Sequence, residues 1–251
     1  MKIAILSDIH GNLPALETVL EDTADTDVDE LWCLGDTVGY GAFPNECAAL
    51  VQERCSAALL GNHDLAALGR LDTSTFSAAA SAAVEWSEAA LDERTRAYLG
   101  TLSPSDASRP AALYHASPRD PVWEYVLWPE QAAECLMAQE RRVSMVGHSH
   151  VALFFSIPEP TDPRAAPERE ARGWQAGAGT KLEISEGRWL INPGSVGQPR
   201  DGDPRAAWLE LDTETWEATY HRIAYDIERA ATAIFAAGLP ENLGKRLHVG
   251  R

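Results

Sequence analysis

The sequence predicts an α/β fold in which buried strands alternate with amphipathic helices. Residues 2–6 form a short apolar run rich in β-branched side chains, the kind of run that a parallel sheet buries. Asn12 is a suitable N-cap. The apolar residues after it repeat at helical spacing: Leu13, Leu16, Val19 and Leu20. Strand, polar turn and amphipathic helix together form the opening of a βαβ unit.

Further apolar runs predict strands along the rest of the chain. These runs are residues 31–34, 57–60, 111–114, 143–146, 189–191, 206–211 and 216–223. Pro44 opens a predicted helix, residues 74–102 are mostly helical with a second start at Asp92, and a final helix is expected over about 226–237. Residues 158–180 are rich in proline, charge and glycine and form the longest irregular segment, which we interpret as an excursion between strands rather than a mobile lid.

Length, charge and cysteine content narrow the class of protein. A chain of 251 residues is long enough for one large α/β domain or two small ones. The net charge of −17 disfavours non-specific binding to long nucleic acids or to an anionic membrane. The four cysteines form no C-x-x-C motif, no signal peptide is evident, and no apolar run approaches the length of a membrane span. We therefore expect reduced thiols in a cytoplasmic protein.

Five of the predicted strands end in side chains that can bind metal ions. These side chains are Asp8 and His10, Asp36, Asn62 with His63 and Asp64, His115, and His148 with His150. Each could be a helix cap or a surface histidine if it stood alone. Open α/β sheets, however, place their sites at the carboxyl ends of strands, and five repeats of one pattern favour a shared site. If the segment is extended, the i, i+2 spacing of Asp8 and His10 puts both side chains on one face.

The residue types in this set suit a pair of divalent metal ions. Carboxylate and amide oxygens and imidazole nitrogens are ligands for Mn, Fe, Zn and similar ions. A two-metal site needs a carboxylate that bridges the ions, and Asp36 is the natural candidate because it stands alone after its strand. Two ions about 3.5–4 Å apart can share a hydroxide and clamp a phosphate during in-line displacement.

Two other segments could contact a substrate. Trp123, Tyr125 and Trp128 could stack on a nucleobase, although we favour packing between a helix and a sheet. The turn-rich segment 192–200 offers backbone N–H groups and Arg200 for phosphate oxygens, or is simply a tight connection. Tyr40 and Tyr125, near strand ends, are further candidates for contact with a nucleotide.

The sequence resembles the calcineurin-like metallophosphoesterase superfamily over about residues 1–224. The matching motifs are Asp8-x-His10, Gly35-Asp36, Gly61-Asn62-His63-Asp64, His115 and Gly147-His148-x-His150, in the family's order. The segment 192–202 looks like a compact bacterial branch that is often named after diadenosine tetraphosphatases or serine/threonine phosphatases. The resemblance implies one domain over residues 1–251, built as a four-layer α-β-β-α sandwich of two mixed sheets.

The resemblance also implies roles for the site residues. One divalent ion would be held by Asp8, His10, Asp36 and His150. The other would be held by Asp36, Asn62, His115 and His148. His63 would contact the phosphate and assist the leaving oxygen, and Asp64 would orient His63. Manganese is the expected metal, with Fe, Zn, Co and Ni as alternatives.

These implications together predict a phosphodiesterase that hydrolyses small phosphorylated or nucleotide substrates through a metal-bridging hydroxide. A phosphomonoesterase or a protein phosphatase is an alternative within the same reaction class. An alternative of another class is a metal-binding interaction scaffold on the same fold. Because the chain keeps every expected ligand as well as His63, we favour an enzyme. Long nucleic acids and membranes are not expected as partners.

Overall fold

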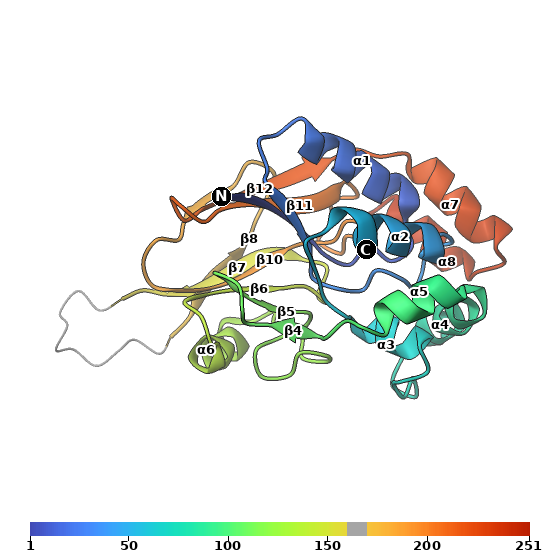
Figure 1. The fold of residues 1–251 in the computed structure, drawn as a ribbon, viewed down its shortest axis with the longest axis horizontal. Helices are drawn as coiled ribbons and strands as arrows, with labels where there is room; N and C mark the ends of the chain where they lie inside the picture. The colour runs from blue at the N-terminus through green and yellow to red at the C-terminus, as the bar shows by residue number, and fades with distance from the viewer. Residues whose placement is uncertain (160–169) are drawn as a thin grey trace.

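The computed structural model describes residues 1–159 and 170–251, which form two mixed β-sheets packed between helices (Figure 1). The first sheet has the strand order β3 (Ala57–Ala58), β2 (Glu30–Cys33), β1 (Lys2–Leu6), β11 (Ala206–Asp212), β12 (Glu217–Ile223) and β9 (Lys181–Glu183). The second has the order β4 (Ser105–Asp106), β5 (Ala112–Tyr114), β6 (Val143–Val146), β10 (Arg188–Pro193), β7 (Ala152–Ile157) and β8 (Arg172–Gln175). The four-layer sandwich is thereby confirmed.

Each sheet contains three neighbouring parallel strands, and this places the carboxyl ends of those strands together. Strands β1, β2 and β3 are parallel in the first sheet, and β5, β6 and β10 are parallel in the second. Their other neighbours pair antiparallel, as β1 does with β11 and β10 with β7. The carboxyl ends of the parallel strands in each sheet therefore lie at one edge, where sites form in such sheets.

Helices cover the outer faces of both sheets. The helices α1 (Leu13–Ala24) and α2 (Pro44–Arg54) pack on the first sheet, and α6 (Pro129–Ala138) packs on the second. The remaining helices are α3 (Asn62–Ala67), α4 (Ala78–Ala90), α5 (Glu93–Leu99), α7 (Ile227–Ala236) and α8 (Glu241–Leu247). Helix α7 lies beside α1, and α4 packs with α7 and α8 around Tyr40, so these elements gather near the strand ends (Figure 1).

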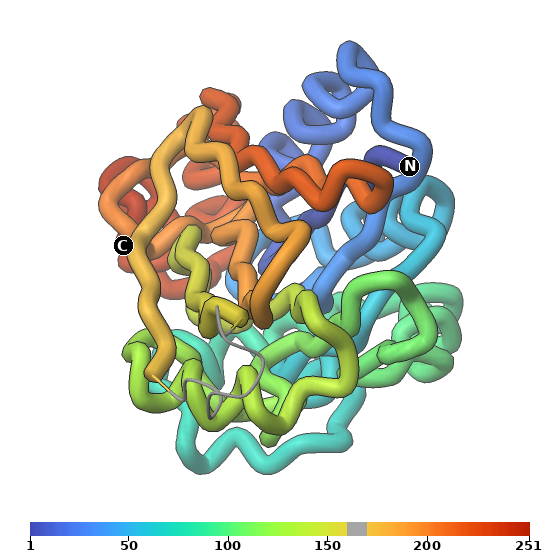
Figure 2. Tube along the Cα trace, turned by 90° about the vertical axis from the view of Figure 1, so that its left-hand side faces the viewer, coloured from blue at the N-terminus to red at the C-terminus, as the bar shows by residue number. Residues whose placement is uncertain are grey.

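The main core lies between the two sheets. Ile3, Ile5 and Trp32 from the first sheet meet Met145 and Ile191 from the second, and all five are fully buried. Figure 2 shows this arrangement from the side, with the blue and orange-red segments of the first sheet above the green and yellow segments of the second. Burial of large apolar side chains of this kind, worth about 1.5–3 kcal/mol each, holds the sheets face to face.

The predicted elements at the start of the chain are confirmed. Strand β1 and helix α1 occur where expected, and the Asn12 side chain accepts a hydrogen bond from Ala15 N at 3.2 Å, as an N-cap does. The prediction missed β4, β7, β9, α6 and α8, and β3 is shorter than the predicted run. The irregular segment 158–180 is partly wrong, because β8 lies within it and pairs with β7. Its residues 160–169 lie outside the part of the chain that the structure describes. For them, the choice of an excursion between strands over a mobile lid stays a prediction.

Two further predictions concern membrane-spanning segments and the state of the cysteines. None of the helices in residues 1–159 and 170–251 has the length and apolar character that crossing a bilayer requires. All four cysteines are free, and Cys33, Cys47 and Cys135 are buried.

Candidate metal centre

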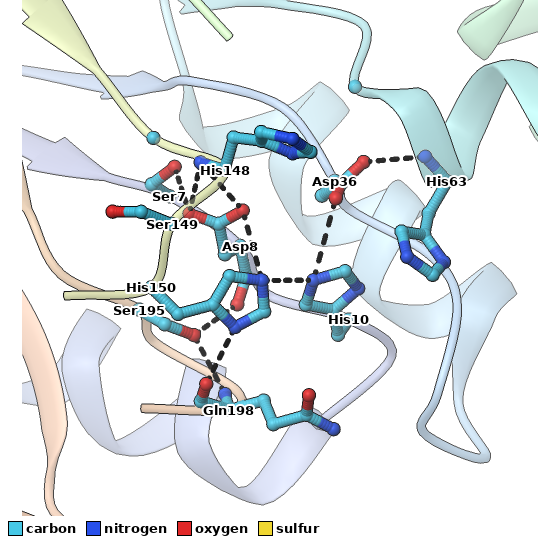
Figure 3. Close-up of polar contacts among 12 residues, drawn as sticks. Ser7, Asp8, His10, Asp36, His63, His148, Ser149, His150, Ser195 and Gln198 are labelled. Carbon is cyan, nitrogen blue, oxygen red and sulfur yellow. Dashed lines mark hydrogen bonds and ion pairs between the residues drawn. The ribbon is translucent and has the colours of Figure 1, made fainter. Parts of the chain in front are cut away.

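The loops after five strands bring the predicted ligands into one buried cluster. Figure 3 shows part of it, with Asp8, His10, Asp36, His63, His148 and His150. Asp8 and His10 follow β1, and Asp36 follows β2 in the same sheet. His115 follows β5, and His148 and His150 follow β6 in the second sheet. Asn62 and His63 begin α3, just after β3. Each of these side chains is at most 5% exposed, although all are polar or charged.

Four of these residues form the first ligand group, Asp8, His10, Asp36 and His150. One ligand atom from each lies within 4.8 Å of the others. The Nε2 atoms of His10 and His150 are 3.1 Å apart, and His10 Nε2 is 3.5 Å from Asp36 Oδ2. His150 Nε2 is also 3.5 Å from Asp8 Oδ1. The structure thus brings together the four residues that the resemblance assigned to one ion.

The second ligand group consists of Asp36, Asn62, His115 and His148. Asp36, His115 and His148 offer ligand atoms within 4.8 Å of one another. His115 Nε2 lies 3.6 Å from Asp36 Oδ2 and 3.1 Å from Asn62 Oδ1. Because Asp36 belongs to both groups, it stands between them, where a bridging carboxylate is required.

The hydrogen bonds on the far side of the rings show that the cluster suits cations. The Nδ1 atoms of His10, His115 and His150 lie 3.1, 2.9 and 2.6 Å from the backbone oxygens of Val38, Leu34 and Gln198. A carbonyl oxygen only accepts, so each Nδ1 carries the proton and each Nε2 presents a lone pair. Lone pairs therefore face one another and face carboxylate and amide oxygens across the cluster.

Two further atoms also indicate that the cluster suits cations. Asp36 Oδ2 and His148 Nε2 are buried and have no hydrogen-bond partner among the described residues. Leaving such acceptors unpaired costs about 1–3 kcal/mol each. Cations among these lone pairs would satisfy all of them, so the residues present fit a dinuclear metal site.

Burial also shifts the acidity of the site groups. Burial raises the pKa of Asp8 to about 7 and raises the pKa of Asp36 well above its usual range. Burial lowers the pKa of His10, His148 and His150 well below the usual range of histidine. The imidazoles are therefore neutral at physiological pH, which is the form that ligates metals.

The backbone at the ligands adopts a conformation that side chains normally avoid. Asp8, His10, Asp36, His148 and His150 have φ between 51° and 63°, in the left-handed region. The prediction that Asp8 and His10 share a face of an extended segment is therefore wrong. They converge because the chain turns sharply after β1, with Asp8 N donating to Gly35 O and His10 N to Asp36 O. Strain of this kind is concentrated at functional sites.

His63 lies at the edge of the cluster, and what holds it differs from the prediction. Asp64 makes no hydrogen bond to the His63 ring; its oxygens accept the N–H groups of Val38 and Gly61 at 2.9 Å. The predicted orienting contact is therefore wrong, and Asp64 instead fixes the loops that carry Asp36 and His63. The His63 N–H donates to Asp36 Oδ1 at 2.8 Å.

Aromatic rings fix the orientation of the His63 side chain. Its ring centroid lies 4.4 Å from that of Tyr40 and 5.0 Å from that of Phe76. Burial, followed by the charges of Arg200 and His115, lowers the pKa of His63 to about 3. Its Nδ1 is buried and has no hydrogen-bond partner among the described residues. His63 is thus a neutral imidazole held by packing.

A cleft of about 470 Å³ opens beside His63 and Asn62. Tyr40, Phe76, Trp123, Tyr125, Arg200 and Arg246 line it. The Tyr125 ring lies 4.1 Å from that of His148, and Trp123 meets Phe76 edge-on at 5.6 Å. Trp128 lies outside the cleft and is 65% exposed, so the expectation that it packs between a helix and a sheet is wrong.

The loop 192–200 does not offer its N–H groups to a phosphate as predicted. The N–H groups of Val196 and Gly197 donate to Ser7 O and Asp8 O. Those of 194, 198 and 200 also donate within the protein. The loop instead supports the ligands, because Ser195 Oγ donates to Asp8 O and Gln198 O receives the His150 N–H. From the loop 192–200, the Arg200 side chain lines the cleft.

Sequence reasoning missed Phe76, Arg246 and the supports Ser7, Ser195 and Gln198. Ser7 Oγ donates to Asp8 Oδ2 at 2.7 Å, and its position beside a ligand was the available signal. No sequence signal indicated Arg246, because it lies 46 residues after Arg200, on a helix that was not predicted. His221 lies away from the site and stacks on Trp208 with ring centroids 4.0 Å apart.

Comparison with known proteins agrees with this geometry. The chain is similar to an uncharacterized protein of Methanocaldococcus jannaschii, with 34% identity over 99% of this chain and 98% of the relative. It is similar in structure to a metallophosphoesterase from Sphaerobacter thermophilus, with 39% identity, a TM-score of 0.86 and coverage of 100% and 99% of the two chains. A hypothetical protein from Pyrococcus horikoshii shares the fold at 19% identity, with a TM-score of 0.76 and coverage of 100% and 98%.

The family match covers most of the chain. Residues 1–214 match the calcineurin-like phosphoesterase superfamily domain, and that stretch contains both ligand groups, His63 and Arg200. The Asp/His cluster and its facing lone pairs have the character that metal-dependent hydrolysis of phosphoesters requires. The chain belongs to the calcineurin-like phosphoesterase superfamily and is a metal-dependent phosphoester hydrolase.

Proposed function

We propose that this protein is a phosphodiesterase that acts on small nucleotide-like substrates. The observation that carries the proposal is the cleft beside His63, which combines aromatic rings with a guanidinium group. Its volume of about 470 Å³ is in the range of small-molecule sites. Tyr125, which is 43% exposed, can stack on a base, and Arg200 can bind phosphate oxygens. Such a cleft accepts substituents on both sides of a phosphodiester.

The ligand groups would hold two divalent ions. Asp8, His10, Asp36 and His150 would hold one ion, and Asp36, Asn62, His115 and His148 the other. We propose manganese in these positions, with Fe, Zn, Co and Ni as alternatives that the same ligands accept. When bound, the ions supply Lewis-acid polarisation of the phosphate and activation of the attacking water.

His63 is the residue placed to assist the leaving group. Its imidazole lines the cleft next to Asn62 and is neutral, because burial holds its pKa at about 3. A neutral imidazole donates an N–H to the leaving oxygen without carrying a charge of its own. A hydrogen bond that stabilises the charge developing on the leaving oxygen contributes about 10²–10³-fold to rate. Tyr40 and Phe76 keep the ring in this position by packing.

The test compares two substrates that differ only in the second ester. Metal-stripped protein is reloaded with manganese and assayed with bis(p-nitrophenyl) phosphate and with p-nitrophenyl phosphate, followed by nucleotides. We expect kcat/KM for the diester to exceed that for the monoester by at least about tenfold, a difference of about 1.4 kcal/mol in transition-state stabilisation. Dominant monoester turnover would instead indicate a phosphomonoesterase or protein phosphatase. Two bound metals with no turnover on the whole panel would indicate a scaffold.

A further inference from the structure

Tyr40, in the loop after β2, packs against both a metal ligand and His63. Its ring centroid is 4.6 Å from that of His10 and 4.4 Å from that of His63. The side chain is only 8% exposed, and it lines the cleft beside His63. Its loop is joined to the loop after β1, because Gly41 N donates to His10 O at 2.9 Å. Tyr40 is therefore held firmly next to the groups that the reaction uses.

The backbone of Tyr40 has the same unusual conformation as that of the ligands. Its φ is 57°, in the left-handed region that a bulky side chain normally avoids. Six other described non-glycine residues have a positive φ, and five of them are ligand residues. The sixth, Trp216, packs against the core between the sheets. Because such strain is concentrated at functional sites, the backbone groups Tyr40 with the ligands.

The hydroxyl group of Tyr40 carries a proton that no described residue accepts. Arg200 Nη2 donates to the hydroxyl oxygen at 3.3 Å, so that oxygen is an acceptor in this contact. The hydroxyl proton has no hydrogen-bond acceptor within residues 1–159 and 170–251. A tyrosine hydroxyl loses its proton only near about pH 10, so this group is a donor at physiological pH.

Arg200 presents another free donor beside this hydroxyl. Its guanidinium carbon lies 5.7 Å from the centroid of the Tyr40 ring, and its Nη2 also donates to Gln198 Oε1 at 3.1 Å. The Arg200 Nε is buried and has no partner among the described residues. Its backbone N–H donates to His150 O at 3.1 Å, which joins Arg200 to a ligand residue. Two unused donors, one from each side chain, thus lie close together beside the ligand cluster.

We propose that Tyr40 is a further catalytic residue, whose hydroxyl donates a hydrogen bond to a non-bridging oxygen of the phosphate that is hydrolysed. The inference rests on the proposed function for the place of that phosphate, at the ligand groups and within reach of Arg200. The hydrogen bond stabilises the negative charge on the phosphoryl oxygens in the transition state. No proton is transferred, so the hydroxyl is unchanged when the reaction ends.

Tyr40→Phe tests the proposal, because it keeps the ring that packs on His63 and removes only the hydroxyl. The manganese-loaded proteins are assayed with bis(p-nitrophenyl) phosphate and with p-nitrophenyl phosphate, and bound metal is measured on the same samples. We expect kcat/KM to fall at least about tenfold at unchanged metal content. Unchanged kcat/KM would overturn the proposal.

Tyr225→Phe is the matched control. The Tyr225 hydroxyl also accepts one N–H, from Asn12 Nδ2 at 3.2 Å, but Tyr225 does not line the cleft. The control therefore loses a comparable hydrogen bond away from the phosphate, and it is expected to keep the activity of the unmodified protein.

A double variant separates contact with the phosphate from an effect that passes through Arg200. If the hydroxyl contacts the phosphate, Tyr40→Phe slows the Arg200→Gln protein by a factor similar to that in the unmodified protein. If Tyr40→Phe slows the unmodified protein but not Arg200→Gln, the hydroxyl only orients Arg200. That result would overturn the catalytic role.

This proposal and the proposed function can fail separately. Dominant monoester turnover would contradict a phosphodiesterase, but the Tyr40→Phe test would stand, because both esters place a phosphoryl group at the ligand groups. If the protein hydrolyses neither ester, calorimetric binding of inorganic phosphate to the manganese-loaded protein replaces the assay. We then expect Tyr40→Phe to weaken binding at least about threefold, and equal affinities would overturn the contact.

Discussion

The Nε2 atoms of His10 and His150 lie 3.1 Å apart, and each ring directs its Nδ1 to a backbone oxygen. Two lone pairs in this arrangement repel each other unless a cation lies near both. The first ligand group is therefore held together by the fold against its own electrostatics. Metal binding is expected to stabilise the protein as well as to prepare it for catalysis.

Metal removal is expected to lower the melting temperature. At a metal concentration about 100 times Kd, binding to the folded state alone contributes about 2.7 kcal/mol, which is about 5–10 °C for a chain of this size. Differential scanning fluorimetry of chelator-treated protein, with and without added manganese, measures the shift. The Asp36→Asn variant serves as control, because its bridging carboxylate is lost and its shift should be much smaller. An equal shift in both proteins would mean that manganese acts elsewhere.

Substitutions of Asp36 and of His63 are expected to have different effects on bound metal and on activity. Asp36→Asn weakens both ligand groups, so bound metal and activity are lost together. His63→Ala leaves the ligand set intact and should slow kcat by about 10²–10³-fold at unchanged metal content, because one hydrogen-bond donor to the leaving oxygen is lost. Elemental analysis beside kinetics on bis(p-nitrophenyl) phosphate makes the distinction. Unchanged turnover in His63→Ala would remove this histidine from the mechanism.

Gly39 tests whether packing positions His63. Gly39 has φ +93°, and an added Cβ would lie 2.8 Å from His63 Nδ1. Gly179 has φ +78° with open space around it, so Gly179→Ala is the matched control. Both alanine variants should lose about 1–2 kcal/mol of unfolding free energy because their backbone is left-handed. We expect Gly39→Ala to lose activity and Gly179→Ala to keep it. Equal activities of the two variants would argue that the position of His63 is not critical.

His221 is expected to make stability fall in mild acid. Its ring stacks on Trp208 and its Nε2 is buried without a partner among the described residues, and burial lowers its pKa below the ordinary 6.5. Glu210 and Asp22 oppose this shift, and Lys181 supports it. Because the unfolded chain binds the proton more readily, the contribution is present above the ordinary pKa and is lost as pH falls through the folded value.

The measurement is urea unfolding of metal-free protein between about pH 8 and about pH 5. His221→Phe keeps an aromatic ring against Trp208 and should show a shallower fall than the unmodified protein. Superimposable pH profiles would show that His221 is not held neutral by the fold.

Much of the site could be predicted because its ligands are local in sequence. Each ligand follows an apolar run directly, so the strand ends near residues 6, 33 and 146 could be located from hydrophobicity alone. The resemblance then supplied the grouping of these ligands. The structure agrees with that grouping through the contacts of Asp36 with both His10 and His115.

The parts that could not be predicted depend on tertiary contacts. The left-handed backbone of Asp8 has no local signal, because the Asp8 N–H donates to Gly35 O, which belongs to another strand's loop. The contacts of Asp64 were misjudged for the same reason, since Val38 is 26 residues away. Arg246 reaches the cleft only because α8 folds back against Tyr40.

The most direct test of the two-metal account is a stoichiometric titration. Metal-stripped protein receives manganese in increments while hydrolysis of bis(p-nitrophenyl) phosphate and bound metal are measured on the same samples. The account predicts that activity is absent without metal and reaches its plateau at two bound ions per chain. Activity that persists in the stripped protein, or that reaches its plateau at one bound ion, would contradict it.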